Sequence, residues 1–124
     1  MPFNIRVYYA DTDAGGIVYH SRYLDFCEKA RAEYLREKGI SQSSILEEYG
    51  IAFAVKDIQV IYKRPAKLDD LLTIKTKVIE NTGVIIKMKQ EIYKDETLIS
   101  DIFVSLVCIN KNLKPVKIPK YFIM

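Results

Sequence analysis

The chain has 124 residues, and 19 basic against 16 acidic side chains give it a formal net charge of +3. This length predicts a single domain over residues 1–124 that folds without disulfide or metal staples. The charge excess is too small to indicate a nucleic-acid-binding protein. Because we find neither an apolar run of ~20 residues nor a secretory signal, we expect no membrane insertion and a cytoplasmic location.

The chain has two cysteines and one histidine. Cys27 and Cys108 lie far apart on apolar segments, and without an export signal we expect buried free thiols rather than a disulfide. A lone histidine, His20, and two distant cysteines do not make an ordinary zinc site. We therefore expect no metal and no cofactor.

The predicted elements begin with a short strand at Ile5–Tyr9, followed by a loop that holds two acids and two glycines. From Ser21 to Lys38 apolar residues recur every three or four positions, which predicts a long amphipathic helix. Its expected buried stripe comprises Tyr23, Phe26, Cys27, Ala30, Tyr34 and Leu35. Gly39 is placed for a left-handed cap, and a short second helix is expected from about Ser41 to Tyr49.

The rest of the chain alternates apolar and polar residues and predicts four strands, at Phe53–Tyr62, Leu72–Ile79, Val84–Tyr93 and Leu98–Ile109. We expect successive strands to pair as an antiparallel meander. One long helix with about five antiparallel strands is an α+β architecture, in which a curved sheet wraps the apolar stripe of the helix. The edges of such a sheet favour pairing with a second copy of the chain.

The segment between the first strand and the long helix has the composition of a site. Its carboxylates offer a base or nucleophile, and Gly15 and Gly16 let the backbone approach a bound group. The helix start offers unpaired N–H groups and a positive dipole end, so the segment holds what acyl-transfer hydrolysis needs. The same residues also build plain turns and caps. On spacing alone both interpretations stay open. His20 alone is more typical of a helix start or an interface than of a catalytic base.

The sequence does not match the motifs of several common calcium, hydrolase and nucleotide sites. An EF-hand loop beginning at Asp11 would place Gly15 at the fifth position, with no side-chain oxygen, and Arg22 at the twelfth, where glutamate is required. The chain has no Gly-x-Ser-x-Gly elbow, no P-loop and no dinucleotide-binding fingerprint. Calcium binding, serine-hydrolase chemistry and nucleotide binding of these kinds are therefore not expected.

Two blocks resemble a known family. Residues 11–24, DTDAGGIVYHSRYL, resemble the signature of hotdog-fold acyl-CoA thioesterases of the 4-hydroxybenzoyl-CoA thioesterase type, and most of all its YbgC branch, which is associated with the bacterial Tol-Pal system. Residues 61–70, IYKRPAKLDD, resemble the Tyr-x-x-Pro-Ala-x-x-x-Asp pattern of that family. The resemblance covers nearly the whole chain. It implies a hotdog fold, hydrolysis of an acyl-CoA to free acid and CoA, and a homodimer or homotetramer.

The resemblance also implies roles for single residues. Asp13 matches the catalytic carboxylate, acting as general base or as nucleophile. His20 matches the helix-start position whose backbone N–H polarises the thioester carbonyl. Gly15 and Gly16 would give the backbone clearance, and Asp11 would cap the loop.

On the substrate side, Tyr19 and Tyr23 would either line the acyl pocket or pack in the core. Lys63 and Arg64 precede Pro65 and would contact the phosphates of coenzyme A near the pocket mouth. Lys87 and Lys89 are a second option, and all four are equally compatible with ordinary solvated charges.

Two alternatives remain. One is a hotdog hydratase or dehydratase acting on acyl-CoA or acyl-carrier protein, for which the helix offers Glu28 and Glu33. The other is a non-catalytic module that binds acyl-CoA or serves the Tol-Pal system. For the thioesterase itself, acyl-carrier protein is an alternative partner to a free acyl-CoA.

Overall fold

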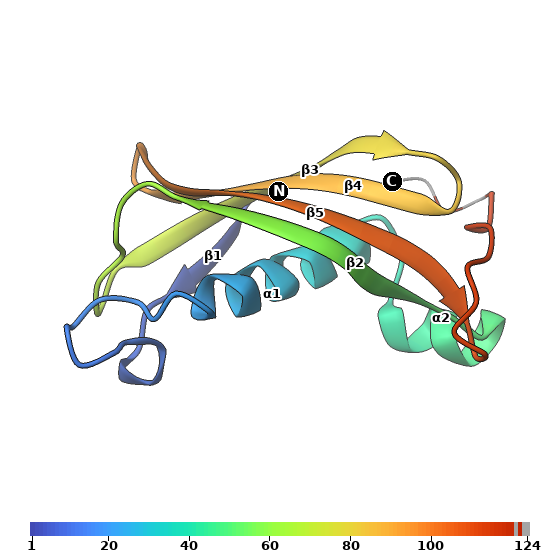
Figure 1. Ribbon diagram of the computed structural model, residues 1–124, viewed down its shortest axis with the longest axis horizontal. Helices are drawn as coiled ribbons and strands as arrows, with labels where there is room; N and C mark the ends of the chain where they lie inside the picture. Colours follow the sequence, from blue (N-terminus) through green and yellow to red (C-terminus); the bar gives the residue numbers. More distant parts are fainter. Residues whose placement is uncertain (121, 123–124) are drawn as a thin grey trace.

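In the computed structural model, which describes residues 1–120 and 122, a curved sheet arches over one long helix (Figure 1). The sheet is antiparallel, in the order β1-β3-β4-β5-β2. Its strands are β1 (Phe3–Arg6), β2 (Ile51–Tyr62), β3 (Leu71–Asn81), β4 (Ile85–Lys94) and β5 (Thr97–Asn110). The long helix α1 (Arg22–Glu37) lies beneath the sheet, and the short helix α2 (Gln42–Tyr49) follows it. This is the predicted α+β hotdog architecture.

Helix α1 is held by its apolar stripe. Tyr23, Phe26 and Leu35 are at most 3 % exposed, and Ala30 and Cys27 are buried beside them. Burying one such large side chain stabilises the fold by roughly 1.5–3 kcal/mol. The helix ends where Gly39 adopts a positive φ of 80°, as its predicted capping role requires. One member of the buried face was not predicted, because Arg31 is also only 7 % exposed.

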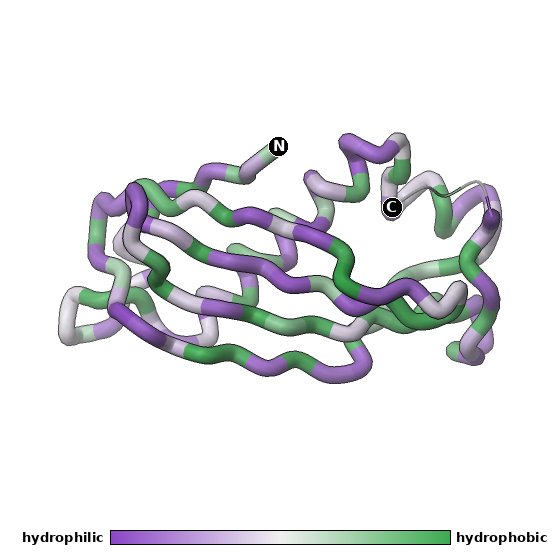
Figure 2. The backbone as a smooth tube through the Cα atoms, turned by 90° about the horizontal axis from the view of Figure 1, so that it is seen from above, coloured by the Kyte–Doolittle hydropathy of each residue, from purple (hydrophilic) through white to green (hydrophobic). Residues whose placement is uncertain are grey.

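The strands alternate as predicted, and Figure 2 shows hydrophilic and hydrophobic residues taking turns along them. In β4, Ile86, Met88 and Ile92 are fully buried, whereas Lys87 is exposed. Gln90 shares the inward-facing side of β4 with them and is also fully buried, which the alternation did not reveal. A polar side chain therefore lies in the core between sheet and helix.

The first strand differs from the prediction at both ends. Strand β1 is Phe3–Arg6 instead of Ile5–Tyr9, and residues 9–11 form a 3-10 turn, η1 (Tyr9–Asp11). The Asp11 carboxylate accepts a hydrogen bond from the Tyr8 N–H at 2.9 Å. This local bond offers the backbone an alternative to a sheet ladder and stabilises the turn.

The predicted meander is wrong in one connection. Strands β3, β4 and β5 follow one another as hairpins, but β2 pairs with β5 and not with β3. The eight residues that join β2 to β3, 63–70, include Pro65 and carry the chain from one side of the sheet to the other. Strand β2 is consequently an edge strand of 12 residues, with a bulge between Val55 and Asp57.

Cys27 and Cys108 are buried free thiols, as predicted. Burial raises the pKa of Cys27 to about 12, with Arg31 acting in the opposite direction, so the thiol stays protonated at neutral pH. Among the described residues, no helix has the length and apolar character to span a membrane. Within the same part of the chain, no three His, Cys, Asp or Glu side chains gather as a metal site.

Candidate active site

The loop between β1 and α1 is closed by hydrogen bonds at its base. The carbonyl oxygen of Asp11 accepts from the Tyr19 N–H at 2.8 Å, and Val18 N–H donates to the Ala66 carbonyl oxygen at 2.9 Å. Together with the bond from Tyr8 N–H to its carboxylate, this makes Asp11 the loop cap that was predicted. The loop is thereby tied to the β2–β3 connection.

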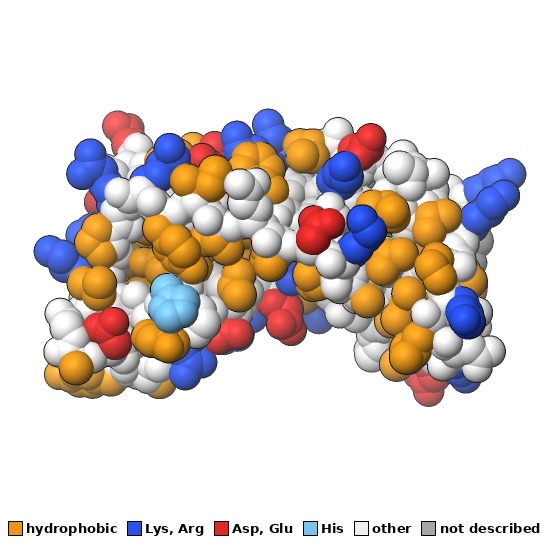
Figure 3. All heavy atoms as spheres, in the orientation of Figure 1, with side chains coloured by type: hydrophobic (Ala, Val, Ile, Leu, Met, Phe, Trp, Pro, Cys, Tyr) orange, Lys and Arg blue, Asp and Glu red, His pale blue; other side chains and the backbone are white. Residues whose placement is uncertain are grey.

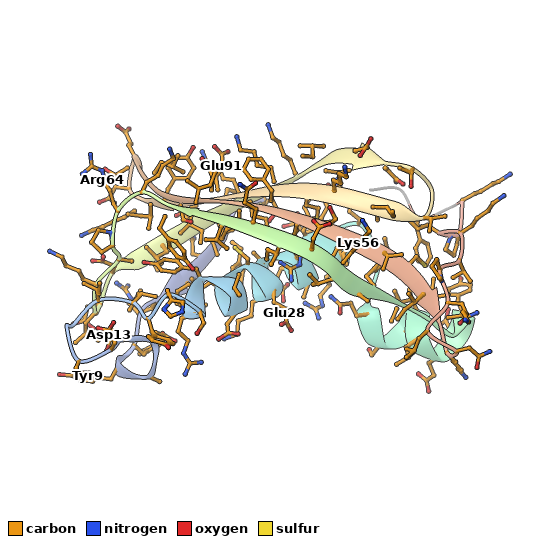
Figure 4. All side chains as sticks on the ribbon, viewed as in Figure 1. Tyr9, Asp13, Glu28, Lys56, Arg64 and Glu91 are labelled. Carbon is orange, nitrogen blue, oxygen red and sulfur yellow. The ribbon has the colours of Figure 1, made fainter. Side chains whose placement is uncertain are left out.

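Asp13 lies at the turn of this loop. Its N–H donates to the Ile17 carbonyl oxygen at 3.0 Å, and its Oδ1 accepts from the Gly15 N–H at 2.8 Å. Oδ2 accepts no hydrogen bond from any described residue. One carboxylate oxygen therefore fixes the orientation of the side chain, and the other is free to accept a proton. In Figure 4, Asp13 lies at the same end of the molecule as Arg64.

The two loop glycines meet different requirements. A Cβ at Gly15 would lie 3.2 Å from Oδ1 of Asp13, so a side chain there would press on the carboxylate. Gly16 has a φ of 79°, which L side chains rarely adopt. Both glycines thus hold the conformation of Asp13.

A cavity of about 290 Å³ opens at the start of α1. Its lining comes from the loop, the first turn of α1 and the end of β2, and comprises Ile17, Val18, His20, Tyr23, Tyr62, Lys63, Arg64 and Pro65. Four predicted site residues are thus brought together: His20, Tyr23, Lys63 and Arg64. The other four, Asp13, Gly15, Gly16 and Tyr19, belong to the adjoining loop and do not line the cavity. Figure 3 shows the single histidine exposed among hydrophobic side chains at this end.

His20 lies two residues before the first helical residue, Arg22, and therefore not in the first turn as expected. Its N–H forms no hydrogen bond within the described part of the chain. Its carbonyl oxygen accepts the Tyr62 hydroxyl at 2.7 Å, and its ring packs against Tyr19 with centroids 4.4 Å apart. The free amide remains available to a bound group even though the helix begins later.

Tyr62 begins the second family pattern, but the sequence interpretation gave it no role in the site. It lines the cavity, holds the His20 carbonyl, and contacts the Tyr23 ring edge-on at 5.5 Å. Burial raises the pKa of Tyr62, so the hydroxyl is a donor at neutral pH. The signal was its place at the end of a strand directly before Lys63, but no local pattern reveals a contact with a residue 42 positions away.

The two predicted tyrosines, Tyr19 and Tyr23, lie in different environments. Tyr23 is 3 % exposed and does both expected things, since it lines the cavity and packs in the core. Its hydroxyl accepts from the Ala66 N–H at 3.1 Å, and burial raises its pKa. Tyr19 is 46 % exposed and lies against His20 instead of in the cavity or the core.

Of the two predicted pairs of basic residues, only one lies at the cavity. The backbone N–H groups of Lys63 and Arg64 both donate to the Ile99 carbonyl oxygen, which holds their exposed side chains at the cavity. Lys87 forms an ion pair with Glu80 at 3.2 Å and Lys89 one with Glu91 at 3.9 Å. Figure 4 shows Glu91 above the sheet, on the side away from α1. The alternative pair of lysines is therefore not at this cavity.

Known proteins resemble this chain in both sequence and fold. The family model "Thioesterase-like superfamily" matches residues 7–123. The acyl-CoA thioesterase YbgC of Haemophilus influenzae is 46 % identical over 119 residues, 95 % of this chain and 88 % of that protein. The acyl-CoA thioester hydrolase YbgC of Escherichia coli O157:H7 is 42 % identical over 118 residues, 94 % of this chain and 87 % of that protein.

A solved structure agrees with these relatives. A probable thioesterase from Bartonella henselae superposes with a TM-score of 0.93 at 38 % identity, covering 96 % of this chain and 98 % of that one. The expected resemblance is therefore confirmed over nearly the full length, in sequence and in the arrangement of strands around α1. The chain belongs to the thioesterase-like superfamily, as a YbgC-like enzyme with the hotdog fold.

Proposed function

We propose that this protein hydrolyses acyl-CoA thioesters at the cavity that opens at the start of α1. Water adds its oxygen to the thioester carbonyl carbon, the C–S bond breaks, and the products are a carboxylic acid and the thiol of coenzyme A. The observation that carries this proposal is that His20, whose backbone N–H has no partner among the described residues, lines a cavity next to a carboxylate loop and two cations.

Asp13 is the base or nucleophile in this proposal. Its Oδ1 is held by the Gly15 N–H, and its Oδ2 has no hydrogen-bond partner among the described residues, which leaves one oxygen available to a water molecule or to the carbonyl carbon. Although Asp13 does not line the cavity, its loop runs directly into residues 17–20, three of which do. A substrate that extends out of the cavity along this loop would bring its carbonyl to the carboxylate.

The amide of His20 stabilises the oxyanion. A donor positioned before the charge develops stabilises the transition state by about 3–4 kcal/mol. The positive end of the α1 dipole adds to the same field. Tyr62 serves as a positioning residue here, because its hydroxyl fixes the His20 carbonyl and thereby the backbone that carries the donor.

Lys63 and Arg64 contact the phosphates of coenzyme A. Both side chains are exposed at the rim of the cavity, and among the described residues neither forms an ion pair. A flexible lysine and a planar guanidinium next to each other suit a charged group of varied geometry.

The active assembly is a homodimer, or a homotetramer built from dimers, joined through the edge strand β2. This strand has 12 residues and no partner strand on its outer side within the described chain. Val55 and Ile61 expose 51 % and 39 % of their surface on it. Pairing with a second copy would satisfy the free edge and cover these side chains.

The remaining expectations stay predictions. The enzyme would act in the cytoplasm on free acyl-CoA, with acyl-carrier protein as an alternative carrier of the acyl group. The link to the Tol-Pal system rests on the resemblance to the YbgC branch. Family membership favours hydrolysis over hydration or dehydration.

The test is thiol release from a panel of acyl-CoA thioesters that differ in chain length. We expect turnover with at least one chain length and no formation of a 3-hydroxyacyl or enoyl product. Binding without turnover throughout the panel would contradict the proposal in favour of an acyl-CoA-binding module. Hydration of an enoyl-CoA without thiol release would contradict it in favour of a hydratase.

A further inference from the structure

The segment that follows β5, residues 111–120, carries a row of lysines and is called the lysine segment below. Lys111, Lys114, Lys117 and Lys120 recur at every third position. All four side chains are exposed, and none forms an ion pair with a described residue. Figure 1 shows the segment in red beside α2, at the end of the molecule away from the loop between β1 and α1. Four uncompensated charges thus lie on one short stretch of chain.

Hydrogen bonds hold the lysine segment against the body of the protein. Val116 N–H donates to the Cys108 carbonyl oxygen at 2.9 Å, and Ile118 N–H donates to the Gly83 carbonyl oxygen at 2.7 Å. The Ile118 side chain is buried in the core, and Val116 packs against the same core. Because these apolar side chains anchor the segment, its lysines are a fixed feature of the surface.

The turn that opens the segment presents an exposed leucine. Leu113 has a φ of 61°, in the left-handed region that bulky side chains rarely adopt. The turn is closed by Asn110, whose Oδ1 accepts the N–H groups of Asn112 and Lys114 at 2.9 and 3.1 Å. Leu113 nevertheless exposes 76 % of its surface. Packing within the chain does not explain an apolar side chain at a position that suits glycine or asparagine better.

We propose that the lysine segment attaches this protein to an anionic lipid surface, with Leu113 in the interfacial layer and the lysines against the lipid phosphates. Peripheral attachment to membranes combines these two features, basic side chains and an apolar side chain that enters the interface. Glu47 and Glu48 are exposed on α2 at the same end and weaken the attraction, but the lysines outnumber them.

The leucine favours lipid over an acidic protein as the partner. A protein would need a pocket shaped for Leu113, whereas a fluid lipid layer accepts an apolar side chain anywhere on its surface. The attachment is peripheral, since no described helix could span a membrane. This inference goes beyond the proposed function and does not depend on it.

The test is sedimentation of the native oligomer with vesicles of phosphatidylcholine, alone or mixed with phosphatidylglycerol. We expect binding to the mixed vesicles to be at least ~10-fold tighter and to weaken as salt is added, because salt screens the lysine charges. Equal affinity for both vesicles, or no binding to either, would overturn the proposal. Failure to bind mixed vesicles, together with lysine-dependent binding of polyglutamate, would overturn it in favour of an acidic protein.

Paired variants locate the attachment. Lys111→Gln/Lys114→Gln should weaken binding to mixed vesicles ~20-fold, because each lysine near an anionic surface strengthens binding about fivefold. Lys75→Gln/Lys77→Gln removes the same charge from two exposed lysines of β3 and should leave binding nearly unchanged. Equal losses in the two variants would show that net charge alone governs binding and would overturn the assignment to the lysine segment.

Leu113→Asn separates attachment from stability. Asparagine suits a positive φ, so the melting temperature should stay the same or rise, whereas binding to mixed vesicles should weaken about fivefold because the apolar side chain is lost. A lower melting temperature with unchanged binding would assign Leu113 a structural role and overturn its part in the proposal. Thiol release measured without vesicles should be unchanged in this variant and in Lys111→Gln/Lys114→Gln.

A fluorescent reporter shows which end meets the lipid. The chain has no tryptophan, so Leu113→Trp reports on the turn alone. Its emission should shift to the blue on mixed vesicles, whereas that of Tyr9→Trp, at an exposed position of the opposite end, should not (Figure 4). A shift in Tyr9→Trp only would place the lipid at the active-site end and overturn the proposal. Vesicle binding without turnover would refute the proposed function alone, and turnover without vesicle binding would refute this site alone.

Discussion

Helix α1 carries two polar regions of opposite design. At its start, His20, Lys63 and Arg64 are exposed on loops around a cavity, and a backbone amide stays unpaired. Halfway along it, Arg31 and Gln90 are buried and joined by side-chain hydrogen bonds that link the helix to the sheet. The first region keeps a backbone donor free for a substrate, while the second joins helix and sheet through side-chain hydrogen bonds. Substitutions in the two regions should therefore affect different observables.

The largest effect is expected at the catalytic loop. Asp13→Ala should lower kcat by ~10²–10⁴-fold, because a base or nucleophile is lost, and it should leave the melting temperature almost unchanged. Thiol-release kinetics and thermal unfolding measure the two quantities. Asp11→Ala is the matched control, since it removes the carboxylate that caps the Tyr8 N–H and should act mainly on stability. Near-normal turnover in folded Asp13→Ala would sink the catalytic assignment.

A substitution in the buried region around Arg31 and Gln90 should lower stability and leave kcat unchanged. Gln90→Leu removes the side chain that accepts a hydrogen bond from the buried Arg31 guanidinium and should lower the free energy of unfolding by about 3 kcal/mol, with kcat per folded molecule preserved. Urea denaturation checks the first quantity and active-site-normalised turnover the second. A stable variant with a large loss of kcat would mean that the two regions are not separable in function.

The cations at the cavity should affect binding more than chemistry. Lys63→Glu or Arg64→Glu should raise KM for acyl-CoA about tenfold with little change in kcat, because phosphate contacts act on ground and transition states alike. The rise should shrink with short pantetheine thioesters, which lack the nucleotide phosphates. Lys87→Glu, on the outer face of the sheet, serves as the control. Equal losses on both substrates would remove these residues from the phosphate site.

A smaller effect is expected from Asp70, in the connection between β2 and β3. Its burial acts to raise its pKa, but hydrogen bonds from the Lys67 N–H and from Lys94 outweigh this and hold the pKa below its usual value. A lowered folded-state pKa stabilises the fold above the unfolded value near 4, and this contribution disappears as the pH falls through the folded value.

Asp70→Asn should therefore cost about 1 kcal/mol of unfolding free energy at neutral pH. The difference from wild type should shrink below about pH 4, where the unfolded carboxyl is protonated. Chemical denaturation at several pH values measures it. A difference that stays constant down to pH 2 would show that the charge of Asp70 plays no part.

The two regions of α1 also differ in how well the sequence predicted them. Local periodicity predicted the stripe of α1 and four of the five strands, and the loop at Asp13 stood out because adjacent residues form it. Contacts between distant residues stayed hidden. The pairing of β2 with β5, and the bonds from Tyr62 to His20 and from Arg31 to Gln90, join segments that no local pattern connects. From the sequence alone, an arginine beside an apolar stripe, such as Arg31, is interpreted as a solvated charge. Its burial becomes evident only once the sheet is seen to cover it.

The central claim is that a backbone amide at the start of α1, and not the imidazole, polarises the thioester carbonyl. The direct measurement is kcat for His20→Ala and His20→Pro, with circular dichroism and oligomer mass confirming that both fold. His20→Ala keeps the N–H and should lose about tenfold, whereas His20→Pro deletes the donor and should lose ~10²–10³-fold. If His20→Ala is as inactive as folded His20→Pro, the imidazole itself takes part in catalysis and the account is wrong.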